Sequence, residues 1–82
     1  MRATREDLRN WIEEALKANG GYASIAGVGK FIWNNYEEDL RNSGDLFYTW
    51  QYDIRWAANV LRRTNKMRSA EVSPAGIWEL NG

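Results

Sequence analysis

The chain contains no cysteine and no histidine, and these absences exclude several kinds of chemistry at once. Without cysteine there is neither a disulfide nor a thiolate metal site. Without histidine, zinc-finger ligand sets, Ser-His-Asp and Cys-His nucleophiles and imidazole proton shuttles are excluded as well. No apolar run approaches the ~20 residues of a membrane span, and the N-terminal segment lacks a signal-peptide core. We therefore expect a cytoplasmic, non-catalytic protein that uses no cofactor or metal and contacts no membrane.

The length of 82 residues predicts one small domain over residues 1–82, with a core of limited size. Five Trp, four Tyr and two Phe compensate for the missing covalent cross-links, because each aromatic side chain buries a large apolar area. The 11 basic and 11 acidic residues give a formal net charge of zero. This balance argues against a nucleic-acid partner, since nucleic-acid-binding domains usually have a basic pI.

Helical periodicity predicts a first helix that follows a capping pattern formed by Thr4 and Asp7. Its apolar positions have the spacing of one helix face. They are Leu8, Trp11, Ile12, Ala15 and Leu16. Asn19 and the two glycines after it end this helix, and a very short extended segment follows at residues 22–23.

A second helix is predicted from Ser24, its N-cap, to about Leu40, with a loop at residues 42–45. Gly27 and Gly29 each cost such a helix about 1 kcal/mol, and a close approach of another backbone would explain them. A third helix is predicted over residues 49–64 and ends where Asn65 takes the left-handed conformation. Its inward face is formed by Trp50, Ile54, Ala57, Ala58 and Leu61.

The C-terminal part is predicted to form a β-hairpin, in which residues 67–72 and 77–80 are the strands and residues 73–76 the turn. Three helices closed by such a hairpin form an α+β, mostly helical domain with the layout of a winged helix-turn-helix. In this layout residues 49–64 are the recognition helix and the hairpin is the wing.

The residues that strengthen this interpretation lie in four segments along nearly the whole chain. They are Trp11, Ala15 and Leu16 with Gly20 and Gly21; Trp50; residues 54–57 with Leu61; and residues 76–80, which read Gly-Ile-Trp-Glu-Leu. Together they resemble the N-terminal winged-helix domain of Mrr-type restriction proteins and the DNA-reading modules of modification-dependent restriction endonucleases. The chain departs from this pattern at Asn65, where such domains commonly have glycine.

The resemblance implies a module of a prokaryotic, nucleoid-associated restriction system that binds double-stranded DNA. A nuclease domain usually accompanies this module, and it has no counterpart in the chain. The resemblance therefore implies a specificity domain excised from a larger restriction-type protein, with a fused nuclease as partner. The resemblance to these modules further implies that the domain recognises a modified base, N6-methyladenine. We expect the isolated domain to be a monomer.

The residues expected to contact DNA are mostly those that the third helix and the segment after it turn outward, because Arg pairs with guanine and Asn or Gln with adenine. They are Tyr48, Thr49, Gln51, Tyr52, Arg55, Trp56, Asn59, Arg62, Arg63, Lys66 and Arg68, with Lys30 as a phosphate contact. Residues 55–68 contain five basic and no acidic residues, whereas residues 37–53 contain five acidic residues and one basic residue. The net charge of zero therefore conceals a dipolar chain.

Aromatic residues crowd the start of the third helix, where an apolar surface could accept a methyl group in the major groove. Trp50 and Trp78 are expected in the core, which leaves Tyr48, Tyr52 and Trp56 as the exposed candidates. Two other interpretations remain open. Basic residues late in a helix also stabilise its negative end, so they need not bind a ligand. The aromatic surface could then dock a protein, and the domain would be an interaction module. A small transcriptional regulator, which would dimerise, is the third possibility.

Overall fold

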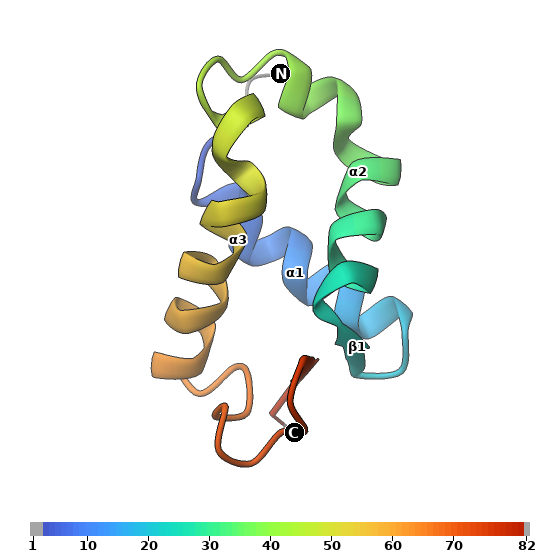
Figure 1. Cartoon of the computed structure of the whole chain (residues 1–82), viewed down its shortest axis with the longest axis vertical. Coiled ribbons are helices and arrows are strands. Elements are labelled where there is room, and N and C mark those ends of the chain that lie inside the picture. Colours follow the sequence, from blue (N-terminus) through green and yellow to red (C-terminus); the bar gives the residue numbers. More distant parts are fainter. Residues whose placement is uncertain (1–2, 82) are drawn as a thin grey trace.

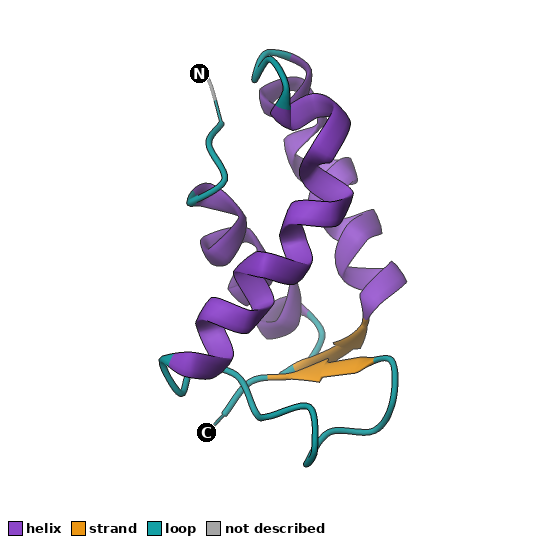
Figure 2. Ribbon diagram, turned by 60° about the vertical axis from the view of Figure 1, so that its left-hand side comes forward, coloured by secondary structure: helices purple, strands orange, loops and turns teal. Residues whose placement is uncertain are grey.

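Three helices and two short strands follow one another in the computed structural model, which describes residues 3–81. The elements are α1 (Asp7–Ala18), β1 (Tyr22–Ser24), α2 (Ile25–Arg41), α3 (Leu46–Arg63) and β2 (Ile77–Glu79). Helices α2 and α3 meet at their connecting loop, and α1 packs against both (Figure 1). The two strands lie together at the opposite end of the helices (Figure 2). This part of the chain is therefore a compact, mostly helical α+β domain with a two-stranded antiparallel sheet.

The core forms where the apolar faces of the three helices meet, as the periodicity of the sequence predicts. All five predicted core residues of α1 and all five of α3 are buried. Trp50 and Trp78 are 5% and 4% exposed, which confirms that both belong to the core. None of the helices within residues 3–81 is long and apolar enough to cross a membrane.

Local capping signals set several of the helix ends. The Ser24 hydroxyl accepts a hydrogen bond from the Gly27 N–H at 3.0 Å, which confirms Ser24 as the N-cap of α2. At α1 only half of the predicted capping pair forms, because the Asp7 carboxylate accepts from the Thr4 N–H at 2.8 Å but the helix begins at Asp7 itself. Asn65 has φ of 63° and ends the turn after α3 in the predicted left-handed conformation.

The Ser24 cap gives a direct test of how α2 is joined to β1. Replacement Ser24→Ala removes the side-chain acceptor for the Gly27 N–H, so we expect a loss of about 1 kcal/mol in the free energy of unfolding. Urea denaturation followed by far-ultraviolet circular dichroism measures this loss. Ser69→Ala, at an exposed position with no side-chain hydrogen bond among those of residues 3–81, is the matched control and should change stability by less than about 0.5 kcal/mol.

Two expectations for the helices are wrong. Helix α3 begins at Leu46, three residues before the predicted Thr49, so Phe47 and Tyr48 belong to its first turn. Within residues 3–81, no backbone of another element comes within 4 Å of a Cβ built at Gly27 or Gly29. A Cβ at Gly29 would meet nothing within 4 Å, and one at Gly27 would meet the Ser24 hydroxyl at 3.1 Å.

The predicted C-terminal hairpin is also wrong in its first strand. Strand β2 pairs with β1 instead, with Ala23 opposite Trp78. Residues 67–72 contribute only an isolated bridge between Met67 and Leu80. The chain then turns locally, because the N–H groups of Val72 and Ser73 both donate to the Ser69 carbonyl, at 3.1 and 3.2 Å. These N–H groups are therefore not available for a ladder with β2.

Helices α1 and α2 are held together by a stacked aromatic pair. The rings of Trp11 and Tyr36 are 4.1 Å apart and nearly parallel, and the Tyr36 hydroxyl donates a hydrogen bond to the Glu14 carboxylate. This hydrogen bond, together with partial burial and the nearby negative charges of Glu14 and Asp39, raises the pKa of Tyr36 to about 12. The backbone of Tyr36 leaves helical geometry, with φ of −130° and ψ of 19°, so α2 is kinked here.

Candidate functional site

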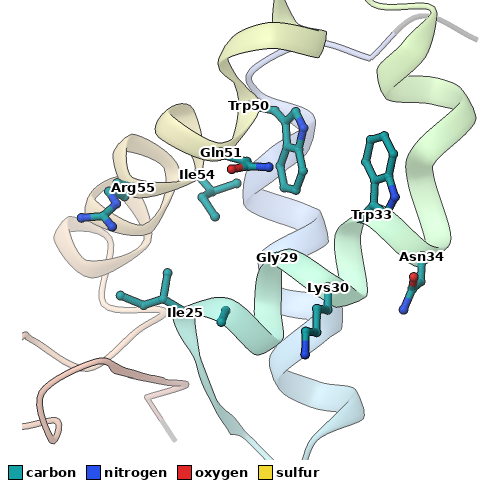
Figure 3. A pocket seen from close by; sticks show the side chains of 10 residues that line it. Ile25, Gly29, Lys30, Trp33, Asn34, Trp50, Gln51, Ile54 and Arg55 are labelled. Atoms are coloured by element: carbon teal, nitrogen blue, oxygen red, sulfur yellow. The ribbon is translucent and has the colours of Figure 1, made fainter.

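A groove of about 540 Å³ lies between α2 and α3, and Figure 3 shows the side chains that line it. Helix α2 contributes Ile25, Ala26, Gly29, Lys30, Trp33 and Asn34. Helix α3 contributes Trp50, Gln51, Ile54 and Arg55. The two helices diverge from their connecting loop toward the end of the domain that carries the sheet (Figure 1).

The inner part of the groove is aromatic. The rings of Trp33 and Trp50 lie 6.1 Å apart, with an angle of only 7° between their planes. Trp50 is a core residue, whereas Trp33 is half-buried and packs against the core. The Arg41 guanidinium and the Phe47 ring lie against Trp33, at 5.4 and 6.4 Å from its ring centre. These contacts fix the position of the Trp33 ring in the groove.

A second hollow of about 320 Å³ adjoins the groove, between α3 and the segment that leads into β2. From α3 it is lined by Arg55, Asn59 and Arg62. The opposite side consists of Ala70, Pro74, Ala75, Gly76, Ile77 and Trp78. Ile25 and Arg55 line both depressions, so the groove and the second hollow form one continuous surface, which we call the concave face.

The polar side chains of the concave face are all cationic or amide. Lys30, Arg55 and Arg62 supply positive charge. The amides are Asn34, Gln51 and Asn59, and none of the carboxylates of residues 3–81 lines either depression. The acidic residues 37–39 lie farther along α2, toward the loop at the other end of the helices (Figure 1). The charged side chains that the structure places on the concave face are thus all positive, although the formal net charge is zero.

The structure brings together five of the twelve residues that the sequence analysis selected for DNA contact. Lys30, Gln51, Arg55, Asn59 and Arg62 line the concave face. Figure 3 shows the Gln51 amide pointing into the groove beside Trp50, while Arg55 extends away from it. The Arg62 side chain is held by a hydrogen bond from its Nε to the Arg68 carbonyl at 3.3 Å.

The tyrosines and Arg63 are exposed on α3 but line neither depression. Tyr48 and Tyr52 are 82% and 79% exposed, which confirms the expectation for these two rings. Arg63 is exposed as well. Thr49 is also exposed, and its hydroxyl donates to the Asp53 carboxylate at 2.8 Å.

The remaining three candidates are engaged with other parts of the domain. Lys66 pairs with Glu13 at 3.8 Å, and Arg68 pairs with Glu79 at 4.0 Å. Trp56 is half-buried because the guanidinium of Arg5 lies 3.9 Å above its ring, contrary to the expectation that this indole is exposed. These three side chains are therefore occupied by contacts within the domain.

The contribution of α2 apart from Lys30 is not predicted by the sequence. Neither Trp33 nor Asn34 is among the residues expected to contact DNA. The spacing of the residues along α2 could have identified both. Trp33 and Asn34 follow Lys30 by three and four residues, and such positions lie on one helix face. That face continues beyond the apolar core and forms the α2 wall of the groove.

No protein-family model, no curated protein and no solved structure matches this chain. The resemblance to the Mrr-type winged helix therefore stays a prediction from the sequence. Among residues 3–81, no three acidic side chains gather closely enough to hold a metal ion. The physical character of the concave face is thus the evidence on which a functional interpretation depends.

Proposed function

We propose that this domain is a non-catalytic module that binds double-stranded DNA through α3 and the concave face. The observation that carries the proposal is the composition of that face, where three cations and three amides meet with no carboxylate among them. Cations bind phosphates and give affinity, whereas Arg, Asn and Gln can also read base edges. Both kinds of contact are present on one side of one helix.

A winged helix-turn-helix arrangement is the form of this proposal that fits the elements best. Helices α2 and α3 with their connecting loop correspond to the helix-turn-helix, and α3 to the recognition helix. Its 18 residues extend over about 27 Å, and the width of a helix fits the major groove. Residues 67–80 correspond to the wing. The Met67–Leu80 bridge supports this assignment, because it joins the start of this segment to the residue that follows β2.

The experiment that tests the proposal is binding of the purified domain to a short labelled duplex over a series of salt concentrations. Three phosphate contacts from Lys30, Arg55 and Arg62 predict that the logarithm of the binding constant falls with the logarithm of salt with a slope of about −3. Fluorescence anisotropy measures both quantities. Absence of binding at low salt would contradict the proposal.

Recognition of N6-methyladenine for a fused nuclease is the more specific form of the proposal, and it depends on the resemblance to restriction modules. The structure adds an apolar surface beside α3 in the form of Ile25, Trp33 and Ile54, which line the groove together with Gln51. A methyl group at a base edge fits such a surface better than it fits water. Equal affinity for methylated and unmethylated duplexes of one sequence would contradict this part alone.

A protein-interaction module is the second candidate, and one observation favours it. Tyr48 and Tyr52 are large aromatic side chains that α3 exposes almost completely, and exposed apolar groups of this kind mark docking surfaces. This candidate and the small dimeric regulator predict association of the chain that depends on its concentration. Sedimentation equilibrium at low and high salt, without DNA, distinguishes them from a monomeric DNA-binding module.

A further inference from the structure

We infer that the groove between α2 and α3 is a pocket for a single nucleobase that is not stacked within the duplex. This inference rests on the proposed DNA-binding function and adds to it a preference for DNA with an unpaired or extruded base. Phosphate and base-edge contacts from α3 and Lys30 explain binding to paired DNA, but they leave the Trp33 ring without a stacking partner from the DNA.

The size and walls of the groove fit a planar aromatic ligand. Its volume of about 540 Å³ lies within the range of roughly 300–1,000 Å³ that is typical of pockets for small molecules. The indole rings of Trp33 and Trp50 are stacked with their centres 6.1 Å apart and form the aromatic wall of the groove, in which Trp50 is buried and Trp33 half-buried. Aromatic side chains bind unstacked bases by their π-faces, irrespective of base identity. Trp33 is the more exposed of the two rings and is therefore the stacking partner.

The polar residues around this wall fit the other parts of a nucleotide. The Gln51 amide points into the groove beside Trp50, where it can donate to and accept from the edge of a base (Figure 3). Lys30 from α2 and Arg55 from α3 stand on opposite walls and supply positive charge for phosphates. No carboxylate lines the groove. An anionic ligand with an aromatic ring matches this combination, whereas an aliphatic peptide segment would leave the cations without partners.

The competing depression does not have these properties. The second hollow is smaller, about 320 Å³, and Trp78, its one aromatic lining residue, is 4% exposed. It offers Arg55, Asn59 and Arg62 to a ligand but no comparable stacking surface. We therefore assign the base to the groove and the flanking phosphates to the edge that both depressions share at Arg55.

Three labelled duplexes of one sequence test the inference. The first is fully paired, the second carries one extrahelical adenine, and the third carries an extrahelical abasic spacer at the same position. The abasic duplex has the same backbone distortion without a base. Stacking of one base predicts that the wild-type domain binds the adenine duplex on the order of 10- to 100-fold more tightly than the abasic duplex.

Substitutions place this preference in the groove. Trp33→Leu keeps an apolar side chain but removes the stacking surface, so the preference for adenine over the abasic spacer should fall below about 3-fold while binding to the paired duplex persists. Gln51→Ala, at an exposed position, should reduce the preference without any effect on folding. Tyr22→Leu is the matched control, because this exposed ring on β1 lines neither depression and should leave the preference unchanged. Circular dichroism checks that each variant is folded.

The outcomes separate the inference from the proposed function. Binding to paired DNA with equal affinity for the adenine and abasic duplexes would overturn the base pocket and leave the DNA-binding function standing. A preference for adenine that Trp33→Leu and Gln51→Ala both retain would overturn the assignment to this groove. Failure to bind any of the three duplexes at low salt would overturn the proposed function and the inference with it.

Discussion

Replacement Arg55→Ala should weaken binding to paired DNA by about 1 to 3 kcal/mol, roughly a 5- to 150-fold loss of affinity. Arg55 is the cation that lines both the groove and the second hollow, so it stands at the centre of the concave face. The side chain is exposed, and its loss should change the free energy of unfolding by less than about 0.5 kcal/mol. Anisotropy titrations at fixed salt measure the effect.

Two further variants identify which property of Arg55 matters. Arg63→Ala removes the same charge from the same helix at an exposed position outside both depressions, so its effect should be several-fold smaller. Arg55→Lys keeps the charge but loses the planar fork that pairs with guanine. A phosphate contact predicts that Lys restores most of the affinity, whereas a guanine contact predicts that Lys restores little of it. Equal losses for Arg55→Ala and Arg63→Ala would instead indicate that only the total charge of α3 matters.

The sequence predicts the helices well because their signals are local. The faces of α1 and α3 follow from apolar residues that repeat every three or four positions, and the end of α1 follows from Gly20, whose φ is 78°. The start of α3 is less predictable. Asp45 precedes it in helical conformation and makes no side-chain cap, so no residue marks the boundary at Leu46.

The sheet could not be predicted from local signals because its partners are far apart in the chain. Pro74 and Gly76 correctly indicate a turn before β2, and they make the preceding segment look like its hairpin partner. The sheet instead joins residues 22–24 to residues 77–79, a choice that depends on where α1 and α2 place β1. Trp78 shows the physical reason, since its pairing with Ala23 places the indole in the core.

The candidate site was only partly predictable for a similar reason. A helical wheel separates exposed from buried residues of α3, but it does not show which exposed residues face another element. Gln51 and Arg55 lie beside α2 and line the groove, whereas Tyr48 and Tyr52 lie on the same helix and do not. Trp56 illustrates the opposite case, because Arg5, which is distant in sequence, covers its ring.

The division of charge makes the proposed DNA-binding surface compatible with a net charge of zero. Lys66 and Arg68 are balanced within the domain by Glu13 and Glu79. The cations of the concave face have no carboxylate beside them in either depression. The concave face offers only three cations to phosphates, so non-specific affinity should be low. Discrimination between DNA sites must come from contacts within the grooves.

Replacement Trp50→Ala should have the largest effect on folding, because this side chain belongs both to the core and to the wall of the groove. Truncation of a buried Trp costs about 3 to 5 kcal/mol. A domain of 82 residues is stabilised by only roughly 4 to 12 kcal/mol in total, so this loss removes between about a quarter and all of its stability at 25 °C. Urea denaturation, or thermal denaturation for the weakest variants, measures this loss.

The controls for Trp50 use the same helix and the same ring chemistry. Tyr52→Ala removes an aromatic side chain of similar size two residues away, but that ring is 79% exposed, so stability should change by less than about 0.5 kcal/mol. Trp50→Phe keeps most of the buried apolar area and should cost about 1 to 2 kcal/mol. Comparable losses for Trp50→Ala and Tyr52→Ala would contradict the placement of Trp50 between the core and the groove. In a folded Trp50→Phe variant the aromatic wall of the groove is smaller but still present. The preference of this variant for an extrahelical base should therefore lie between the preferences of the wild-type domain and of Trp33→Leu.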